Sequence, residues 1–410
     1  MSLADKVKIR VPEKEKDENG YYIRLAGKFR VLKYIFGIAF VVFLVFMLVA
    51  FRESITYENL QYMLRDLSAA RYDSDFSSID FGNEDISFAT IYRGEILTAG
   101  KKEVSLFSVS GNKTLGETVS LSLPRVEASE KYFLVFDAKG KSYSVYNSYS
   151  KLHSESFEYT VTDACMSDSG SYAVVTSTRE YPYAVYLYNN DFKRIGEYFK
   201  NKYLMDVSLS GDGSRLLVLS FLVEDGDFVT EVSTYTAMKE GSEQTFSIPG
   251  AFPVAGRVFN DGSSLIITDL GAYMFNPSGT RTAEVSASGR DLTGFAFGDR
   301  YSVMLFRENR SIQETRAVIF DTNGDVLYNS NVEETVRSAS VSEDLVCLLC
   351  ENSVISVEPG NGKVRKASCE EDGISAVIMR RTGGEPRVTV CYSDCARSVE
   401  FESEVNAEVE

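Results

Sequence analysis

The stretch Ser210-Gly211-Asp212-Gly213, followed by SRLLVLS over residues 214–220, decides the fold, because the same turn before an apolar strand recurs along the chain. Clear copies precede SYAVV, SSLIIT, RYSVMLF and LVCLL, and looser ones lie at Arg93-Gly94, Ser129-Glu130 and Gly383-Gly384. The copies fall near positions 94, 130, 170, 213, 262, 299, 344 and 384, in steps of 36 to 49 residues. A strand, a turn and another strand, as in VIFDTNGDVLYNS, follow five of them.

Units of this length with four short strands each are typical of β-propeller blades. We therefore predict an all-β domain, a single β-propeller over residues 72–404, with eight blades favoured and seven possible. The last unit offers only three clear strands, whereas the segment FSSIDF at residues 76–81 is a spare strand before the first unit. Because an open ring would leave an exposed sheet edge, we expect residues 76–81 to complete the final blade. Residues 405–410 form a short acidic tail.

An uncharged apolar run extends from Tyr34 to Phe51. As a helix it would reach about 27 Å, close to the ~30 Å of a bilayer core, so we predict a transmembrane helix over residues 31–52. Residues 1–33 carry nine Lys or Arg against five Asp or Glu, which places the N-terminus in the cytoplasm and the propeller outside. An uncleaved anchor is favoured over a signal peptide cleaved near Leu48-Val49-Ala50.

Two segments flank this run. Residues 1–30 are highly charged, and we expect a disordered cytoplasmic tail. Residues 53–71 are expected to form a juxtamembrane amphipathic helix, with Thr56 as N-cap and an apolar stripe at helical spacing made by Leu60, Met63, Leu64 and Leu67. Packing of this stripe against the propeller is favoured, and self-association or a second membrane protein is the alternative.

The charge balance narrows the classes of partner. After residue 33 the chain carries 34 basic and 54 acidic residues, and such a surface repels phosphate backbones. We therefore expect no nucleic-acid binding and interpret the acidic surface as a soluble, self-repelling one.

Six cysteines in a chain expected to be exported raise the question of disulfides. Cys347 and Cys350 lie in one apolar strand at odd separation, so their side chains are expected on opposite faces. Cys391 and Cys395 flank a turn and could form a bridge, although buried free thiols are the favoured interpretation.

The sequence contains little recognisable chemistry. Its one histidine, His153, lies in the turn-rich stretch YSKLHSES and is interpreted as a surface loop residue. No nucleophile elbow, phosphate-binding loop or calcium-binding loop is found, and Asp73-Ser74-Asp75 is too short for the last of these. Acidic clusters such as Glu370-Glu371-Asp372 are interpreted as solvated loops. We predict no catalytic, cofactor-binding or metal-binding residues and no cofactor.

The repeats resemble those of WD40-like and quinoprotein-dehydrogenase-like propellers, without Gly-His or Trp-Asp dipeptides. With the basic tail, one anchor and a juxtamembrane segment carrying Glu58-Asn59-Leu60, Leu64 and Leu67, the chain resembles an uncharacterised Gram-positive family of single-pass, membrane-anchored β-propeller proteins. This resemblance implies fold and location only, and no functional residue is transferred by it.

The expected function is that of a non-enzymatic protein-interaction or scaffold module of the cell envelope. The propeller would be anchored by one pass in the cell membrane and would contact an envelope protein. The alternative is an enzyme or binding protein for a cell-wall sugar or small ligand at the propeller axis. Carboxylates that converge roughly 5–10 Å apart in a deep cleft at the axis would favour this alternative, whereas a flat or plugged axis lined by small and apolar residues would favour the scaffold.

Overall fold

The computed structural model describes residues 28–29, 31–43, 45–46, 78–82, 86–108, 110–237, 239, 241–307, 314–342, 344–370, 372–379 and 387–401. The chain divides into two compact units, Met1–Asp73 and Ser74–Glu410. The predicted tail up to residue 27, the segment 53–71 and the acidic end 405–410 lie outside the described residues.

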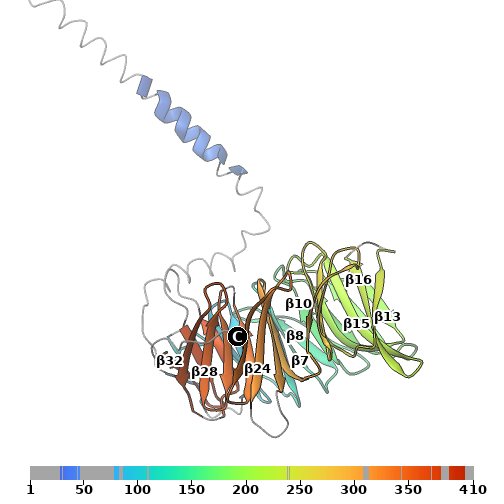
Figure 1. Cartoon of the computed structure of the whole chain (residues 1–410). Coiled ribbons are helices and arrows are strands. Elements are labelled where there is room, and N and C mark those ends of the chain that lie inside the picture. The colour runs from blue at the N-terminus through green and yellow to red at the C-terminus, as the bar shows by residue number, and fades with distance from the viewer. Residues whose placement is uncertain are drawn as a thin grey trace, which may run out of the picture. The chain divides into compact units, whose positions relative to one another are not determined.

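The first unit contains a helix at residues 31–43, with further helical residues at 28–29 and 45–46 (Figure 1). None of the helices described is both long and apolar enough to cross a membrane. The predicted span over residues 31–52 is therefore not confirmed. The described helix ends before the apolar run does, and residues 44 and 47–52 of that span lie outside the described part.

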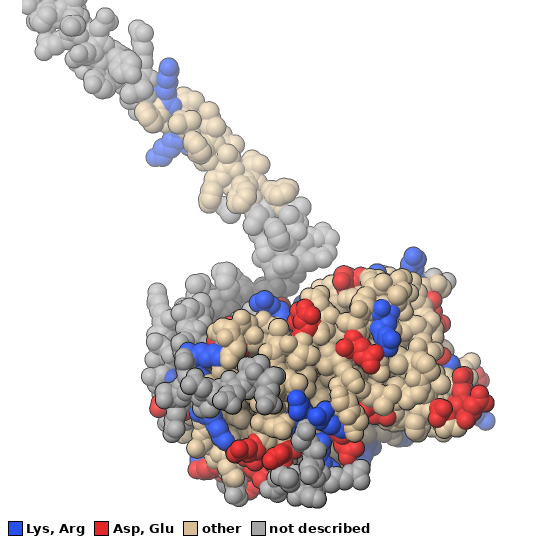
Figure 2. Space-filling model, viewed as in Figure 1, with Lys and Arg blue, Asp and Glu red and all other residues tan. Residues whose placement is uncertain are grey.

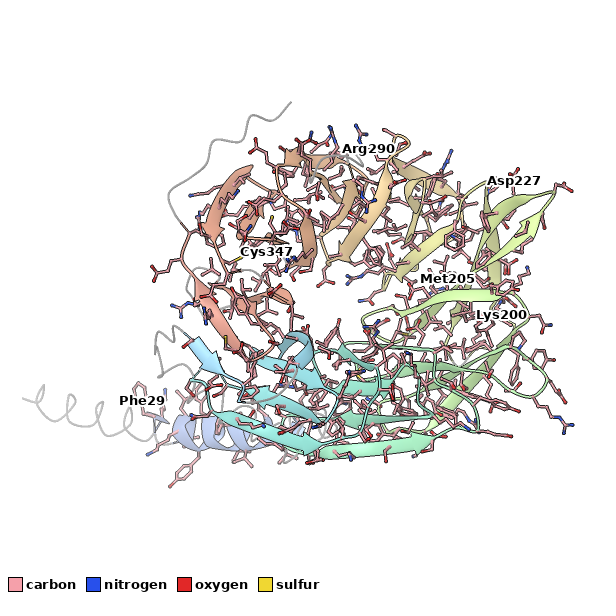
Figure 3. All side chains as sticks on the ribbon, turned by 90° about the horizontal axis from the view of Figure 1, so that it is seen from below. Phe29, Lys200, Met205, Asp227, Arg290 and Cys347 are labelled. Carbon is pink, nitrogen blue, oxygen red and sulfur yellow. The ribbon has the colours of Figure 1, made fainter. Side chains whose placement is uncertain are left out.

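The second unit is an eight-bladed β-propeller, as predicted, built from eight antiparallel sheets of four strands (Figure 1). Each sheet has one strand next to the axis, where the first strands of most neighbouring blades contact one another (Figure 3). These innermost strands of blades 1 to 8 are β2 (Ile86–Tyr92), β6 (Pro124–Ala128), β10 (Asp163–Met166), β14 (Tyr203–Leu209), β18 (Pro253–Val258), β22 (Asp291–Phe297), β26 (Val336–Val341) and β30 (Ser375–Met379).

The remaining strands follow outward in the same blade order. The second strands are β3 (Glu95–Gly100), β7 (Phe133–Asp137), β11 (Tyr172–Thr176), β15 (Arg215–Glu224), β19 (Ser264–Thr268), β23 (Tyr301–Arg307), β27 (Val346–Cys350) and β31 (Arg387–Cys391). The third strands are β4 (Glu103–Phe107), β8 (Ser142–Tyr146), β12 (Tyr183–Tyr188), β16 (Asp227–Thr236), β20 (Gly271–Phe275), β24 (Thr315–Asp321), β28 (Ser353–Glu358) and β32 (Cys395–Val399). The outermost strands are β5 (Lys113–Thr118), β9 (Lys151–Ser156), β13 (Arg194–Lys200), β17 (Gln244–Pro249), β21 (Arg281–Ser286), β25 (Val326–Val332), β29 (Lys363–Ser368) and, in blade 8, β1 (Ser78–Asp80).

The ring closes as the sequence predicted. Strand β1 pairs with β32, with Ile79 opposite Ala396, and completes the sheet of the last blade. The backbone N–H of Phe81 continues the contact by donating to the carbonyl of Asp394 at 2.8 Å. Ile79 and Phe81 are both buried in a cluster that joins blade 8 to blade 1, so that the two ends of the propeller share one core.

The recurring pattern of a turn before an apolar strand has a physical basis. The apolar run forms the second strand, and in β11, β19 and β27 every residue is buried. In three copies a glycine of the preceding turn has a positive φ, which glycine adopts readily: 89° at Gly170, 72° at Gly213 and 89° at Gly262. Faces of neighbouring blades then pack on each other, as where Ala173 and Val175 of blade 3 join the cluster around Leu216 and Val218 of blade 4.

Candidate functional site

Three acidic residues lie on innermost strands of successive blades, next to the propeller axis. Glu127 on β6, Asp163 on β10 and Asp206 on β14 belong to the innermost strands of three successive blades. Their charges act on one another, with Arg125 as the opposing positive charge. This cluster was not predicted from the sequence, although the three residues follow one another in steps of 36 and 43 residues, within the range of the turn repeat.

Asp163 and Asp206 are held by backbone donors. The carboxylate of Asp206 accepts a hydrogen bond of 2.7 Å from the backbone N–H of Gly256 on β18. Asp163 accepts one of 2.9 Å from Ala164 and another from Val207 on β14. These carboxylates therefore link innermost strands of adjacent blades. This role is structural, and a catalytic role would come in addition to it.

Glu127 differs from the other two. Within the described residues it forms no hydrogen bond or ion pair, and its side chain is accessible to water although protein surrounds it. The pKa of its carboxyl group is raised to about 8, mainly because protein encloses the group. The negative charges of Asp163 and Asp206 raise this pKa further, whereas the positive charge of Arg125 lowers it. Water that reaches the side chain weakens the effect. The direction of the shift means that Glu127 holds its proton to a higher pH than an ordinary glutamate.

Burial likewise raises the pKa of Asp163 and of Asp206, against the backbone hydrogen bonds that lower both values. The cluster can therefore retain protons near neutral pH and attract a cation when it loses them. Among the described residues, no group of three or more His, Cys, Asp or Glu is arranged to hold a metal ion.

The repeated turns link neighbouring blades at one end of the innermost strands. The Asp212 backbone N–H donates to the Asn260 side chain of the next blade at 3.0 Å. Arg257 of blade 5 forms an ion pair with Asp299 of blade 6. Burial raises the pKa of Asp168 in blade 3, and the charge of Asp299 contributes. The acidic turns that the sequence marked as repeat boundaries thus belong to an interacting network.

His153 does not lie in a surface loop, and that interpretation was wrong. It is a half-buried residue of β9, paired with Val145. Its ring stacks on Phe192 of blade 3 with centroids 5.3 Å apart. The segment KLHSES is mostly polar and therefore resembles a turn in sequence, but it forms the outer strand of a hairpin. The enclosed Nε2 of His153 has no hydrogen-bond partner in the described residues and lies 4.0 Å from the carboxylate of Glu155.

Glu155 in turn is the centre of a tyrosine cluster between blades 2 and 3. Its carboxylate accepts hydrogen bonds from the hydroxyl groups of Tyr188 at 2.8 Å and of Tyr143 at 3.1 Å. Burial raises the pKa of both tyrosines and of Tyr172, which contacts Tyr143. These phenols remain neutral at physiological pH, so the cluster is suited to holding two blades together.

All six cysteines are free. Cys391 lies opposite Ala396 in the β31–β32 hairpin, so the considered bridge to Cys395 is not formed. Cys347 and Cys350 are buried, and burial raises the pKa of both thiols, that of Cys350 to about 12. Thiols that stay protonated are poor nucleophiles, which agrees with the interpretation of buried, inert cysteines.

Blade 4 departs from the regularity of the ring. Its strands β15 and β16 have ten residues each, whereas no other strand described has more than seven. Residues 222–229 extend beyond the pairing of Tyr203 with Phe221, and we call them the blade-four arm. Asp227 marks the tip of this arm in Figure 3, while Met205 lies nearer the centre of the ring. The sequence signal for the arm was the longest repeat step, of 49 residues.

Aromatic rings gather at the base of the arm. Phe221 contacts Tyr203, Phe228 and Phe252, with ring centroids 5.0 to 5.8 Å apart. We call these four residues with Val223 the aromatic surface. Tyr203 is 63% exposed, Val223 58% and Phe228 44%, so rings that contact each other also face solvent. Contiguous exposed apolar side chains of this kind mark interaction sites.

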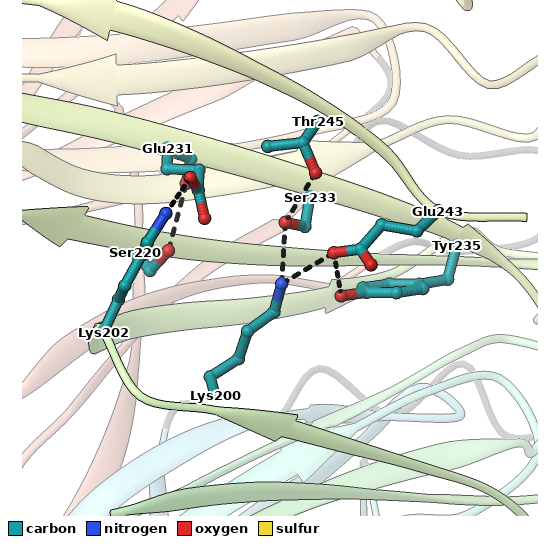
Figure 4. A network of polar contacts seen from close by, with 8 residues as sticks. All are labelled: Lys200, Lys202, Ser220, Glu231, Ser233, Tyr235, Glu243 and Thr245. Atoms are coloured by element: carbon teal, nitrogen blue, oxygen red, sulfur yellow. Dashed lines mark hydrogen bonds and ion pairs between the residues drawn. The ribbon is translucent and has the colours of Figure 1, made fainter. Parts of the chain in front are cut away.

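A polar network supports blade 4 from its neighbour (Figure 4). The ammonium group of Lys200, at the end of β13, lies 2.9 Å from both Ser233 and Glu243. Tyr235 donates to the same Glu243 carboxylate at 2.7 Å. Lys202 forms an ion pair with Glu231. Two lysines of blade 3 and the loop after it therefore hold the outer part of blade 4.

The ring of eight four-stranded blades with innermost strands around an axis defines the class of protein, an eight-bladed β-propeller. The chain belongs to a family of unknown function (DUF5711), whose sequence model matches residues 71–401. No curated protein matches the sequence.

Solved structures resemble this one in fold. The crystal structure of BamB from Moraxella catarrhalis has a TM-score of 0.51 at 12% identity, covering 80% of this chain and 99% of that chain. The Pan2 WD40 domain from Neurospora crassa has a TM-score of 0.45 at 10% identity, covering 69% and 90%. A eukaryotic initiation factor has a TM-score of 0.49 at 13% identity, covering 82% and 93%. At 12% identity the likeness to BamB shows the fold alone, and the predicted β-propeller fold is confirmed at that level.

Proposed function

We propose that this protein is a non-enzymatic protein-interaction module of the cell envelope. Its propeller would be held at the outer surface of the cell membrane by an uncleaved single-pass anchor. The anchor is supported by the uncharged run from Tyr34 to Phe51 and by the excess of Lys and Arg before it. The propeller supplies a rigid scaffold, and binding on such scaffolds commonly resides in the segments that extend from them.

The observation that carries this proposal is the blade-four arm with its aromatic surface. A regular ring needs no strands of ten residues, and the additional length places apolar side chains in solvent. Exposed tyrosine and phenylalanine are enriched at protein interfaces because they bury a large area at a low cost in side-chain entropy. The arm is therefore the part of the described propeller best suited to contacting another protein.

The experiment shortens the arm and keeps the pairing of β14 with β15, while it removes the pairing of Val229 with Pro249 of β17. Phe221 and Thr230 are direct partners across β15 and β16, so Asn-Gly in place of residues 222–229 forms a two-residue hairpin turn. The full-length variant and the unaltered protein are crosslinked in native membranes and purified, with Val326→Ser as a control at an exposed valine of blade 6. We expect loss of a specific partner only in the shortened variant. Equal recovery from all three proteins would contradict the proposal.

A second candidate, binding of a cationic or sugar ligand at the axis, is favoured by the accessible Glu127, on which the charges of Asp163 and Arg125 act. A carboxyl group with a raised pKa in an enclosed position is a feature of many functional sites. Turnover or binding of a wall-derived compound by the unaltered protein, lost in Glu127→Gln, would favour this candidate over the interaction module.

A further inference from the structure

We propose that the blade-four arm and its aromatic surface dock a partner protein segment that combines apolar side chains with lysine or arginine. This inference rests on the proposed function and specifies the chemistry of the partner.

The apolar part of the surface is formed before any partner binds. Val223 and Phe228 are cross-strand partners at the end of the hairpin and are both strongly exposed. Phe228 is fixed by edge-to-face contacts with Phe221 and Phe252, at centroid distances of 5.8 and 5.1 Å. Rings held in this way lose little freedom on binding, which favours affinity. A partner must therefore offer apolar side chains to cover them.

The charged part lies directly beside it. The turn of the arm carries Glu224, Asp225 and Asp227, all exposed, and none forms an ion pair with a described residue. Glu224 and Asp227 are direct cross-strand partners, and like charges in that position destabilise a hairpin. Asp225 has a φ of 52° and Gly226 a φ of 94°, values that hold the turn in a tight hairpin geometry. A cation from a partner would relieve the repulsion.

Lysines that flank the base of the arm do not neutralise the turn. Lys200 is engaged with Glu243, and Lys202 with Glu231 (Figure 4). The visible face in Figure 2 carries interspersed acidic and basic side chains rather than one extended basic region. The arm therefore presents a net negative charge next to an apolar surface.

The same charges argue against two other occupants. A second copy docked arm to arm would bring two acidic turns together in a chain of net charge −16. Anionic lipid headgroups would be repelled by the turn in the same way. A basic and apolar segment of another protein satisfies both halves of the surface.

The test uses the full-length protein in detergent and two short labelled peptides, one alternating leucine with lysine and one alternating leucine with glutamate. Binding is measured by fluorescence anisotropy. We expect the lysine peptide to bind and the glutamate peptide not to bind. Glu224→Lys/Asp227→Lys should weaken binding by at least about tenfold, Val223→Ser should weaken it by a smaller factor, and added salt should weaken it further.

Two matched controls test whether the position matters. Asp191→Lys/Asp325→Lys changes the net charge by the same amount at exposed turns of blades 3 and 6, and Val326→Ser removes an apolar side chain that is 48% exposed. Both should bind the lysine peptide as the unaltered protein does. Equal weakening by the two charge variants, binding of the glutamate peptide, or no binding would overturn the inference.

The alternative occupants give different results. Self-association, or binding to vesicles of phosphatidylcholine and phosphatidylglycerol, that is lost in Val223→Ser would assign the surface to a second copy or a bilayer and overturn the inference. If the shortened arm loses its partner in native membranes while Glu224→Lys/Asp227→Lys keeps it, the proposed function stands and this inference fails.

Discussion

The carboxylate of Asp206 on β14 accepts a hydrogen bond of 2.7 Å from the backbone N–H of Gly256 on β18, across the boundary between blades 4 and 5. Close approach is possible there because residue 256 is a glycine: a Cβ would come within 2.8 Å of Leu217. A side chain thus satisfies a backbone donor of the next innermost strand.

The first prediction separates the hydrogen bond from the charge. Asp206→Ala removes the acceptor and leaves the Gly256 N–H unsatisfied, so the free energy of unfolding should fall by about 1–3 kcal/mol. Asp206→Asn retains an acceptor oxygen and loses the charge next to Asp163, so it should cost much less. Chemical denaturation at neutral pH measures both variants. Equal losses would show that the hydrogen bond is not what stabilises the pair of blades.

The second prediction concerns pH. Burial raises the pKa of Asp163 and Asp206, and enclosure raises that of Glu127 to about 8. The folded state therefore binds more protons than the unfolded state between about pH 4, where unfolded carboxyl groups titrate, and about pH 8. The contribution of these three groups to stability should fall as pH rises through this window.

Glu127→Gln tests the sign, because glutamine does not titrate. The variant should unfold at a higher temperature than the unaltered protein at pH 8, and the difference should shrink toward pH 5. Glu130→Gln, at an exposed turn outside the axial cluster, is the control. A Glu127→Gln variant that is less stable at pH 8 would show that the ionised carboxylate is stabilised at the axis.

The third prediction concerns the network that holds blade 4. Lys200→Met removes the hydrogen bonds to Ser233 and Glu243 and should lower the free energy of unfolding by about 1 kcal/mol, since part of Glu243 is exposed and screened. The hydrogen bond from Lys200 is the largest cause that lowers the pKa of Glu243. This contribution should be present above about pH 4.3 and lost as pH falls further. Lys193→Met, at an exposed position of the same blade, should have no measurable effect on the denaturation curve.

The fourth prediction concerns topology. Protease added to intact cells should digest the propeller side of the chain and leave a small N-terminal fragment, detected through a tag at Met1. The reason is the basic flank before the apolar run, which orients the N-terminus inward. Full protection of the chain in intact cells, with digestion after lysis, would contradict this orientation.

The fold could be predicted from sequence because its strongest signals are local. A glycine turn before an apolar strand, as at Gly213 and Leu216, depends on backbone geometry and burial within one unit. Ring closure was predictable from a missing strand and a spare one, and Ile79 does pair with Ala396. His153 was wrongly predicted to lie in a loop. Its strand carries polar residues on both faces, so the sequence lacks the alternation of polar and apolar residues that indicates a strand.

The residues of the axial cluster and of the aromatic surface were not predicted as site residues, for a physical reason. Glu127, Asp163 and Asp206 are far apart in sequence, and only the ring brings the innermost strands together. The spacing of these three acidic residues matches the repeat and could have indicated the cluster. Using it requires knowing which residues of each blade lie on the innermost strand. Similarly, the length of the 49-residue step was visible in the sequence, but the contact of Phe221 with Phe252 requires two blades to be in place.

The central claim is that this propeller acts by binding through the blade-four arm and not by chemistry at its axis. The most direct measurement compares two full-length variants in native membranes by quantitative crosslinking: Asn-Gly in place of residues 222–229, and Glu127→Gln with Asp163→Asn and Asp206→Asn. The account predicts that the arm variant loses its specific partner and that the axial variant, which retains the acceptor oxygens, keeps it. Loss of the partner in the axial variant with full retention in the arm variant would contradict the account.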